Sequence, residues 1–225
     1  MTLIALIPAR GGSKGIHRKN IRPFCGKPLL QWSIDVALAS TCVDQVVVST
    51  DDQVIAEVAK KGGASVPFLR PAELASDTAP GIAPVLHALQ QFSYVDDVLL
   101  LQPTSPLRTI ADIQAIFDLR QKANCESAVS LTRTPKHPSL MYSIHSHNNI
   151  SSLYQHDQAY SRQQLPPVYV LNGALYLATR NFLLRERAFI SEDTLGYVMP
   201  PERSVDIDNL FEFNWAEFLF HQNKR

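Results

Sequence analysis

A short apolar run followed by a glycine-rich basic loop constrains this chain more than any other feature of its sequence. The run, Thr2 to Ile7, is almost continuously apolar, as is typical of a parallel strand buried on both faces. The loop after it contains Gly11, Gly12 and Gly15, which are expected to take positive φ and to let the backbone approach a ligand. Successive exposed N–H groups in such a loop form an anion-binding concavity. The pattern therefore predicts an anion site directly after the first strand.

The charge of the first 34 residues is strongly one-sided. Although the formal net charge of the whole chain is +0, the residues before Asp35 include no acid and these bases: Arg10, Lys14, Arg18, Lys19, Arg22 and Lys27. Such a local excess favours a polyphosphate site; the alternative is a solvated basic loop after an edge strand, whose glycines serve only the turn. Two familiar phosphate motifs do not fit. Ser13 precedes Lys14 with no earlier glycine at the Walker spacing, and the glycines lack the Gly-x-Gly-x-x-Gly spacing of dinucleotide-binding loops.

The composition indicates the class of protein. With 225 residues, 45% of them hydrophobic, the chain can form one α/β domain over residues 1–225 with a substantial core. Balanced charge and a pI near 7.1 argue against a nucleic-acid or membrane-surface binder. The 3 cysteines lack paired spacing, which favours buried thiols in a reducing compartment over disulfides or a zinc site. Because no signal peptide or membrane-spanning run is evident, we expect a cytoplasmic protein.

Strand-like and helix-like segments alternate up to Leu131. Strands are predicted at 2–7, 45–50, 64–68, 98–102 and 127–131, and helices from Pro28, between Asp52 and Gly62, over 82–92 and over 109–122. Such alternation is typical of a mostly parallel sheet flanked by helices, and hence of an α/β fold.

The alternation stops at Thr132. From there to Pro167 the chain is rich in Pro, His, Ser and Asn, with weak alternation only around 140–144 and 150–154. Because a structureless loop of this length is uncommon in a compact domain, 132–167 is predicted to be an excursion that packs on something else, such as a partner subunit. His145 and His147 lack an evident third metal ligand and are interpreted as solvated surface. A strand at 168–177, a short helix, a strand near 197–199 and a closing helix follow.

Polar residues gather where the predicted strands end. They are Arg10 after the first strand, Asp51 and Asp52 after the second, Arg70 after the third, and Gln102, Thr104 and Ser105 after the fourth. In open parallel sheets, ligands bind outside the carboxyl ends of the strands at the topological switch point, so these side chains are expected to face one crevice. Each residue alone has a structural alternative, since Asp51 and Asp52 are natural helix N-caps and Gln102 could satisfy a turn.

The segment Val205-Asp206-Ile207-Asp208 is a second chemical signal. Alternation places both carboxylates on the same face of an extended segment. Two hard oxygen ligands suit magnesium, which prefers one or two carboxylates plus substrate phosphates. The alternative is that Asp208 caps a helix starting near Asn209 and that Asp206 is solvated. A polyphosphate site without a metal would leave phosphate charge poorly neutralised, which favours the magnesium interpretation.

Taken together, these motifs resemble the acylneuraminate cytidylyltransferases, also called CMP-sialic acid synthetases. The resemblance runs from about residue 3 to residue 219 and is carried by these segments: Ile7 to Asn20, Ser49 to Asp52, Arg70 to Thr78, Leu100 to Arg108, Leu171 to Ala174 and Val205 to Asp208. It implies a Rossmann-like, mixed, mostly parallel sheet of the nucleotide-diphospho-sugar transferase type. It also implies a homodimer, because members of the family pair through an extension that reaches across to the neighbouring subunit, as 132–167 could.

The resemblance further implies a magnesium-dependent reaction in which a nine-carbon 2-keto sugar acid attacks the α-phosphorus of CTP, giving a CMP-sugar and pyrophosphate. The nucleotide would be bound by Arg10, Gly11, Gly12, Ser13, Lys14, Asn20 and Arg70, and the sugar by Gln102, Thr104, Ser105, Tyr169 and Asn172. Asp206 and Asp208 would carry magnesium, and Lys19 would hold the triphosphate. Asp208 and a metal-bound hydroxide are the candidate bases.

Some positions depart from the family pattern. Gly81 stands where a serine near the base is frequent, and Glu212 where a third Asp is usual. Lys136 and Arg162 are the candidates for the basic ligand of the sugar carboxylate. The sequence does not separate pseudaminic, legionaminic and neuraminic acids. An enzyme for the eight-carbon acid Kdo and an inactive nucleotide-sugar-binding or assembly protein of the same fold are the alternatives.

Overall fold

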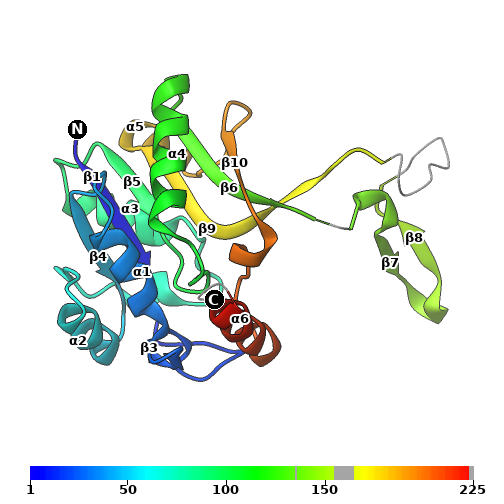
Figure 1. The fold of residues 1–225 in the computed structure, drawn as a ribbon, viewed down its shortest axis with the longest axis horizontal. Coiled ribbons are helices and arrows are strands. Elements are labelled where there is room, and N and C mark those ends of the chain that lie inside the picture. The colour runs from blue at the N-terminus through cyan, green and yellow to red at the C-terminus, as the bar shows by residue number, and fades with distance from the viewer. Residues whose placement is uncertain (135, 155–164, 223–225) are drawn as a thin grey trace.

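The computed structural model describes residues 1–134, 136–154 and 165–222, and its centre is a six-stranded mixed sheet (Figure 1). The strand order is β10-β6-β9-β5-β1-β4. The strands are β1 (Leu3–Pro8), β4 (Gln45–Ser49), β5 (Asp97–Leu100), β6 (Ser127–Arg133), β9 (Tyr169–Thr179) and β10 (Leu195–Met199). β1 pairs in parallel with β4 and β5, and β10 with β6, whereas β9 runs antiparallel to both of its neighbours. The predicted mixed, mostly parallel sheet is confirmed.

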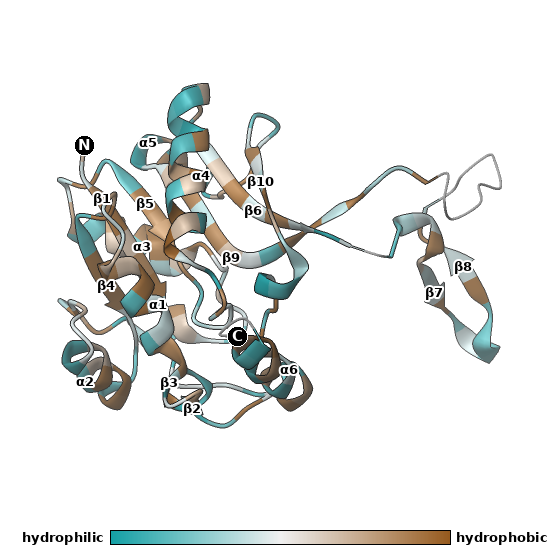
Figure 2. Cartoon of the chain, viewed as in Figure 1, coloured by the Kyte–Doolittle hydropathy of each residue, from teal (hydrophilic) through white to brown (hydrophobic). Residues whose placement is uncertain are grey.

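Helices cover both faces of the sheet. They are α1 (Leu29–Leu38), α2 (Gln53–Lys61), α3 (Ala83–Gln91), α4 (Ile110–Ala123), α5 (Arg180–Glu186) and α6 (Leu210–Gln222). On β1, Ala5 and Ile7 pack in one core cluster with α1, α2 and α4, while Ile4 and Leu6 pack in the other with α3 and α5. This period of two explains why the strand is apolar at every position: both of its faces are buried. Figure 2 shows the same apolar centre.

A third apolar cluster lies outside the two faces of the sheet. It joins Ile16 of the basic loop, Leu107 after β5, Ile207 of the acidic segment, and Phe213 of α6, together with Phe24 and Leu29. Ile207 is fully buried, although it lies between Asp206 and Asp208. Segments that are remote in sequence are thereby held together at one end of the sheet, and Lys19 in the short helix η1 (Lys19–Ile21) reaches the same place.

Local sequence signals set several helix boundaries. The Asp52 side chain caps α2 by accepting hydrogen bonds from the backbone N–H groups of Val54 and Ile55 at 2.7 and 3.0 Å. Thr109 and Asp112 form a capping box at the start of α4. Pro84 lies in the first turn of α3, where its missing N–H leaves no intrahelical bond unmade.

The strand predicted at 64–68 is not formed. The segment makes only two isolated bridges beside β4, between Val47 and Ser65 and between Thr50 and Leu69. Pro67 lies between them and has no N–H to donate to a ladder, so the pairing cannot run through. The segment nevertheless carries the chain along the edge of the sheet to Arg70, whose N–H donates to the carbonyl of Thr50 at 2.7 Å.

The segment predicted to leave the domain projects from the sheet (Figure 1). β6 and β9 stay paired out to Arg133 and Tyr169, and beyond them lie η3 (Pro138–Leu140) and an antiparallel hairpin of β7 (Tyr142–Ile144) and β8 (Ile150–Ser152). Tyr142, Ile144 and Ile150 are exposed on this hairpin. Pro135 and residues 155–164, which include Arg162, lie outside the described residues.

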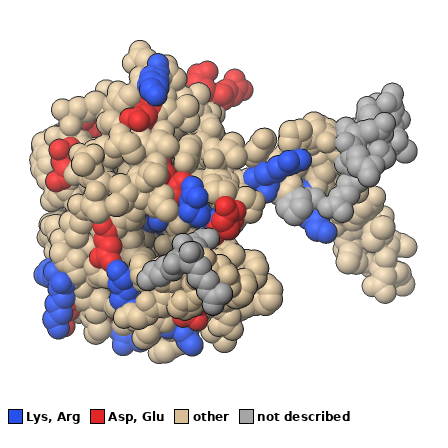
Figure 3. Space-filling model, in the orientation of Figure 1, with Lys and Arg blue, Asp and Glu red and all other residues tan. Residues whose placement is uncertain are grey.

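Charged side chains of both signs are interspersed on the face of the molecule shown in Figure 3. None of the helices in the described part of the chain is long and apolar enough to cross a membrane.

Candidate active site

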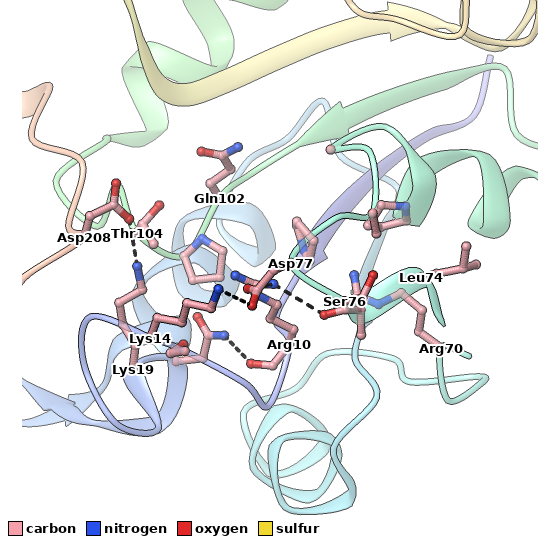
Figure 4. Close-up of a pocket in the computed structure, with 18 of the residues that line it drawn as sticks. Arg10, Lys14, Lys19, Arg70, Leu74, Ser76, Asp77, Gln102, Thr104 and Asp208 are labelled. Atoms are coloured by element: carbon pink, nitrogen blue, oxygen red, sulfur yellow. Dashed lines mark hydrogen bonds and ion pairs between the residues drawn. The ribbon is translucent and has the colours of Figure 1, made fainter. Parts of the chain in front are cut away.

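A cleft of about 550 Å³ opens at the carboxyl ends of β1 and β5 (Figure 4). The chain passes from β1 to β4 on one side and later returns to β5 on the other, so the cleft lies at the switch point of the sheet. Four segments line it: the basic loop, residues 70–84, the turn after β5, and the acidic segment. Of the residues predicted to bind ligands or act in catalysis, the cleft brings together Arg10, Ser13, Lys14, Lys19, Asn20, Arg70, Gln102, Thr104, Asp206 and Asp208.

The glycines of the basic loop differ from expectation. Positive φ was predicted for Gly11, Gly12 and Gly15, but the described glycines with positive φ are Gly26, Gly63 and Gly173. Close packing explains two of the loop glycines: a Cβ on Gly11 would lie 2.8 Å from the Asp52 carboxylate, and one on Gly15 would overlap the carbonyl oxygen of Asp208. Gly11 and Gly12 do not line the cleft. The Gly11 N–H donates to Asp51 at 3.0 Å, which satisfies it within the protein.

Lys19 connects the basic loop to the acidic segment. Its ammonium donates to the Ile207 carbonyl at 2.6 Å and to the Asp208 carboxylate at 3.1 Å, and its side chain is mostly buried. Asn20 is buried beside it and donates to the carbonyl of Arg10 at 2.9 Å, which fixes the base of the loop. The loop is therefore held by two polar side chains whose partners lie at its own start and nearly 190 residues away in sequence.

The remaining cations of the cleft are also paired. Asp77 lies between Arg10 and Lys14, at 2.8 and 2.7 Å. Arg70 is buried, and its guanidinium lies 3.8 Å from the Asp51 carboxylate. Burial lowers the pKa of Arg70, against the attraction of Asp51, and nearby Arg10 lowers it further. Lys14 is the most exposed of the three.

The two carboxylates of the acidic segment both face the cleft, as the alternation predicted. Burial raises the pKa of Asp206, a hydrogen bond from Thr104 opposes the rise, and the charge of Asp208 adds to it. The Oδ1 atom of Asp206 is buried and has no hydrogen-bond partner among the described residues. Asp208 is exposed, and the helix cap belongs instead to Asn209, which accepts from the N–H of Glu212 at 3.0 Å.

Glu212 completes that cap from the other side. Its carboxylate accepts from the N–H groups of Asp208 and Asn209 at 2.7 and 3.2 Å, so it is engaged at the start of α6. Within the described ranges, no group of three or more His, Cys, Asp and Glu side chains is placed to hold a metal. A pair of carboxylates, one with an unpartnered buried oxygen, suits a cation that takes its other ligands from water and phosphate.

Three residues predicted to bind the sugar do not line the cleft. Ser105 is buried and donates to the carbonyl of Asn172 at 3.3 Å. Asn172 is buried, accepts from Ser130 at 2.6 Å and donates to Ser204 at 2.9 Å. Tyr169 lies at the outer end of β9, opposite Arg133. Ser105 and Asn172 support the wall of the cleft from behind.

That wall contains a bulge that sequence analysis missed. Val129 pairs with Tyr176 and Leu131 with Leu171, so residues 172–175 of β9 stand opposite Ser130 alone. Gly173 has φ +72° there, and a Cβ on it would lie 2.8 Å from Oε1 of Gln102 and 3.1 Å from the Asp206 carboxylate. The signal in the sequence is the Asn-Gly pair inside a strand pattern, which is typical of a bulge or of close backbone approach.

Two buried charged residues support other walls of the cleft, and neither was predicted from the sequence. Arg108 is buried and donates to the carbonyl of Gln102 and, at 2.9 Å, to Ser33; burial lowers its pKa to about 9. Asp112 accepts two hydrogen bonds from Arg203, at 3.0 and 2.8 Å, in the turn that leads to the acidic segment. Burial would raise the pKa of Asp112, but these bonds, with others from Thr109 and Tyr197, lower it.

Gly81 lines the cleft, and a Cβ on it would meet nothing within 4 Å. The cleft is therefore open at the position where the resembling family often carries a serine. Lys136, the described candidate for a sugar-carboxylate ligand, is not among the residues that line the cleft.

Comparison with known proteins agrees with this architecture. A family model described as "Cytidylyltransferase" matches residues 4–209. The chain belongs to the cytidylyltransferase family. It is 38% identical over 231 residues to the CMP-N,N'-diacetyllegionaminic acid synthase of Legionella pneumophila, covering 100% of this chain and 98% of that protein.

A second relative and a solved structure extend this comparison. It is 34% identical over 226 residues to the N-acylneuraminate cytidylyltransferase of Escherichia coli, and this match covers 99% of the chain and 53% of the longer relative. Among solved structures, CMP:2-keto-3-deoxy-manno-octonic acid synthetase complexed with CTP superposes with a TM-score of 0.74 over 99% of this chain and 100% of that one. At 16% identity, that likeness shows a shared fold.

Because of the bulge, a side chain at position 173 is expected to lower the free energy of unfolding. Positive φ costs a non-glycine residue roughly 1–2 kcal/mol, and crowding Gln102 and Asp206 adds about 1–3 kcal/mol. We expect Gly173→Ala to lower the free energy of unfolding, measured in urea, by more than Gly26→Ala does. Gly26 is the matched control, because it has φ +94° and a Cβ there would meet nothing within 4 Å.

Adding Gln102→Ala to Gly173→Ala removes the atom nearest the new Cβ and should recover part of the excess loss. Equal losses for Gly173→Ala and Gly26→Ala would contradict the role assigned to the bulge.

Proposed function

We propose that this protein transfers a cytidylyl group from CTP to a nonulosonic, sialic-type acid, releasing a CMP-sugar and pyrophosphate. The observation that carries the proposal is the cleft itself, which is lined by Arg10, Lys14 and Lys19 of one loop and by Asp206 and Asp208. The named activities of the legionaminic and neuraminic relatives support the sugar class. The proposed compartment is the cytoplasm, because cysteines without paired spacing suit a reducing environment.

In this reaction the anomeric hydroxyl oxygen of the sugar acid bonds to the α-phosphorus of CTP. The bond from that phosphorus to the bridging oxygen breaks, pyrophosphate leaves with the electron pair, and the hydroxyl proton passes to a base. Asp208 is the proposed base, since it is exposed in the cleft and only its Oδ1 atom accepts from Lys19. The protein's main contribution is positioning and charge stabilisation rather than covalent chemistry.

Each wall of the cleft has a part in that positioning. Arg10, Ser13 and Lys14 are proposed to bind the phosphates, with Asn20 fixing the loop and Arg70 beside the nucleotide. Gln102 and Thr104 are proposed to meet the sugar. Ser105 and Asn172 act indirectly, by holding the turn after β5 and the bulge that carries Gly173. Tyr169 does not line the cleft, so no role is proposed for it within one protomer.

Asp206 and Asp208 are proposed to hold Mg²⁺. The fit rests on the unpartnered, buried Oδ1 of Asp206 and on two carboxylates in a cleft that would also contain phosphate oxygens. When bound, the ion would supply positive charge that stabilises the phosphoryl oxygens as they accumulate negative charge. Lys19 would keep Asp208 and the backbone of Ile207 in place for it.

A substrate panel tests the proposed activity. Purified protein, CTP and Mg²⁺ are incubated with N-acetylneuraminic, legionaminic, pseudaminic and Kdo acids in turn, and pyrophosphate release is measured. We expect turnover with at least one nine-carbon acid and faster turnover with it than with Kdo. UTP and ATP in place of CTP are the controls for the nucleotide. If CTP binds but no acid is turned over, the protein is a binding or assembly member of the fold.

The acidic segment predicts a large effect of one neutral substitution. Asp208→Asn should lower kcat by roughly a thousandfold, because it removes the proposed base and one of the two proposed ligands of Mg²⁺. The melting temperature should change little, since Asp208 is exposed. The matched control is Glu202→Gln, which removes an exposed carboxylate from the neighbouring turn. Near-normal turnover of Asp208→Asn would remove this residue from the mechanism.

We also propose that a second copy of the chain covers the projecting hairpin, giving a homodimer. The support is its apolar surface: Tyr142, Ile144 and Ile150 are all more than half exposed on a short two-stranded hairpin (Figure 2). Such hairpins are marginally stable without packing partners.

Analytical ultracentrifugation should therefore give a dimer mass, and Ile144→Asp with Ile150→Asp should give a monomer. Leu184→Asp is the control, because Leu184 is an exposed apolar residue on α5, far from the hairpin in sequence. A wild-type monomer at micromolar concentration would contradict the proposed dimer.

A further inference from the structure

The carboxylate of Asp77 occupies the centre of the basic part of the cleft. One of its oxygens lies 2.8 Å from Nη1 of Arg10 and the other 2.7 Å from Nζ of Lys14, so the side chain bridges the two cations (Figure 4). The hydrogen bond from Lys14 lowers the pKa of Asp77, which keeps it ionised at neutral pH.

This bridge conflicts with a bound phosphate chain. Arg10 and Lys14 are the cations proposed to receive the phosphates, and in the described structure their positive ends are turned to a carboxylate. Both cations have further N–H donors, but a phosphate sharing them with Asp77 would bring like charges to within a few Å of each other. The charge of Asp77 therefore opposes phosphate binding, whether the side chain stays or moves.

The segment that carries Asp77 has few contacts with the rest of the protein. Ser76, Asp77 and Thr78 are exposed and lie in turns between the short helix η2 (Ala72–Ala75) and α3. The Ser76 hydroxyl makes local hydrogen bonds, to the carbonyl of Glu73 at 3.1 Å and to the Thr78 hydroxyl at 3.3 Å. The two ion pairs of Asp77, and a hydrogen bond from Nη1 of Arg10 to the carbonyl of Ala75 at 3.4 Å, tie this segment across the cleft to the basic loop. Few contacts of this kind need to break for the segment to swing away.

We infer that Asp77 is an internal competitor for the phosphate chain. It neutralises Arg10 and Lys14 when no nucleotide is bound, yields them to the phosphates of CTP, and takes them back as pyrophosphate leaves. Its charge therefore weakens the binding of CTP and pyrophosphate and speeds product release. The inference rests on the proposed function, because it assumes that the ligand of the cations is a phosphate chain.

The consequence is unusual for an acidic residue in an active-site cleft. Removing it should strengthen ligand binding, because the cations lose the competitor and the phosphates lose a repelling neighbour. Exposed ion pairs contribute little each, so the expected gain is modest, about three- to tenfold in the dissociation constants of CTP and pyrophosphate. Cytidine, which has no phosphate, should bind as before.

The test compares Asp77→Asn and Asp77→Ala with the wild type by titration calorimetry in EDTA, so that no divalent ion bridges carboxylate and phosphate. The ligands are CTP, inorganic pyrophosphate and cytidine, at low and high salt. Glu73→Gln is the matched control: it removes a carboxylate from the same surface segment, four residues earlier, without touching the two ion pairs. Asp77→Glu should behave like the wild type.

We expect both neutral variants at position 77 to bind CTP and pyrophosphate about three- to tenfold more tightly than the wild type, with a gain that shrinks at high salt. In turnover assays, pyrophosphate should inhibit these variants at correspondingly lower concentration. Unchanged or weaker binding of CTP by both variants would overturn the inference. If wild-type protein and variants all fail to bind CTP both in EDTA and with Mg²⁺ added, the proposed function fails instead, and the two outcomes are distinct.

Discussion

The burial of one isoleucine between two acids holds the cleft together. Ile207 is packed with Ile16, Leu107 and Phe213, and its backbone N–H donates to the Thr104 carbonyl at 2.8 Å. Burying such a side chain stabilises the fold by about 1.5–3 kcal/mol, more than exposed polar contacts at the same place could give. Since an extended segment alternates its side chains, fixing Ile207 inward turns Asp206 and Asp208 toward the cleft.

The ammonium of Lys19 also fixes the orientation of the acidic segment. It donates to the carbonyl of the same isoleucine and to Asp208, so the basic loop and the acidic segment share one polar contact next to one apolar cluster. Gly15 closes the arrangement, since any side chain there would overlap the carbonyl of Asp208. A change to any of these residues would move phosphate-facing and metal-facing groups together, because they are parts of a single packed unit.

The opposite wall depends on polar groups instead. The bulge in β9 leaves backbone groups that a regular ladder would have paired, and side chains of Ser130 and Asn172 take their place. Buried polar networks are stable only when nearly every member is satisfied, so this one fixes a single backbone path. That path brings Gly173 against Gln102 and Asp206. The network serves the cleft although Asn172 does not line it.

The sequence predicted the parts of this structure that depend on local pattern. The strand before the basic loop, the helices with their caps, and the convergence of Arg10, Gln102 and Thr104 all follow from periodicity and from the geometry of parallel sheets. The strand expected at 64–68 is not formed, because Pro67 has no N–H to donate to the ladder; the prediction followed the β-like residues around this proline and gave it no weight. The bulge, buried Arg108 and the bridging role of Asp77 depend on contacts between distant segments, which periodicity does not contain.

The cations of the cleft all lie in ion pairs with carboxylates, and this arrangement affects which anions can bind. Arg10 and Lys14 are paired with Asp77, Lys19 with Asp208, and Arg70 with Asp51, at distances from 2.7 to 3.8 Å. Four cations gathered without partners would repel one another and destabilise the loop that holds them. Because carboxylates neutralise them, ligand binding becomes an exchange of partners, and its free energy is the difference between two sets of ion pairs. A ligand with one charge gains little from that exchange, whereas a phosphate chain with several charges can replace several carboxylate contacts at once. The same pairing that neutralises these cations within the protein therefore favours polyphosphates over simpler anions.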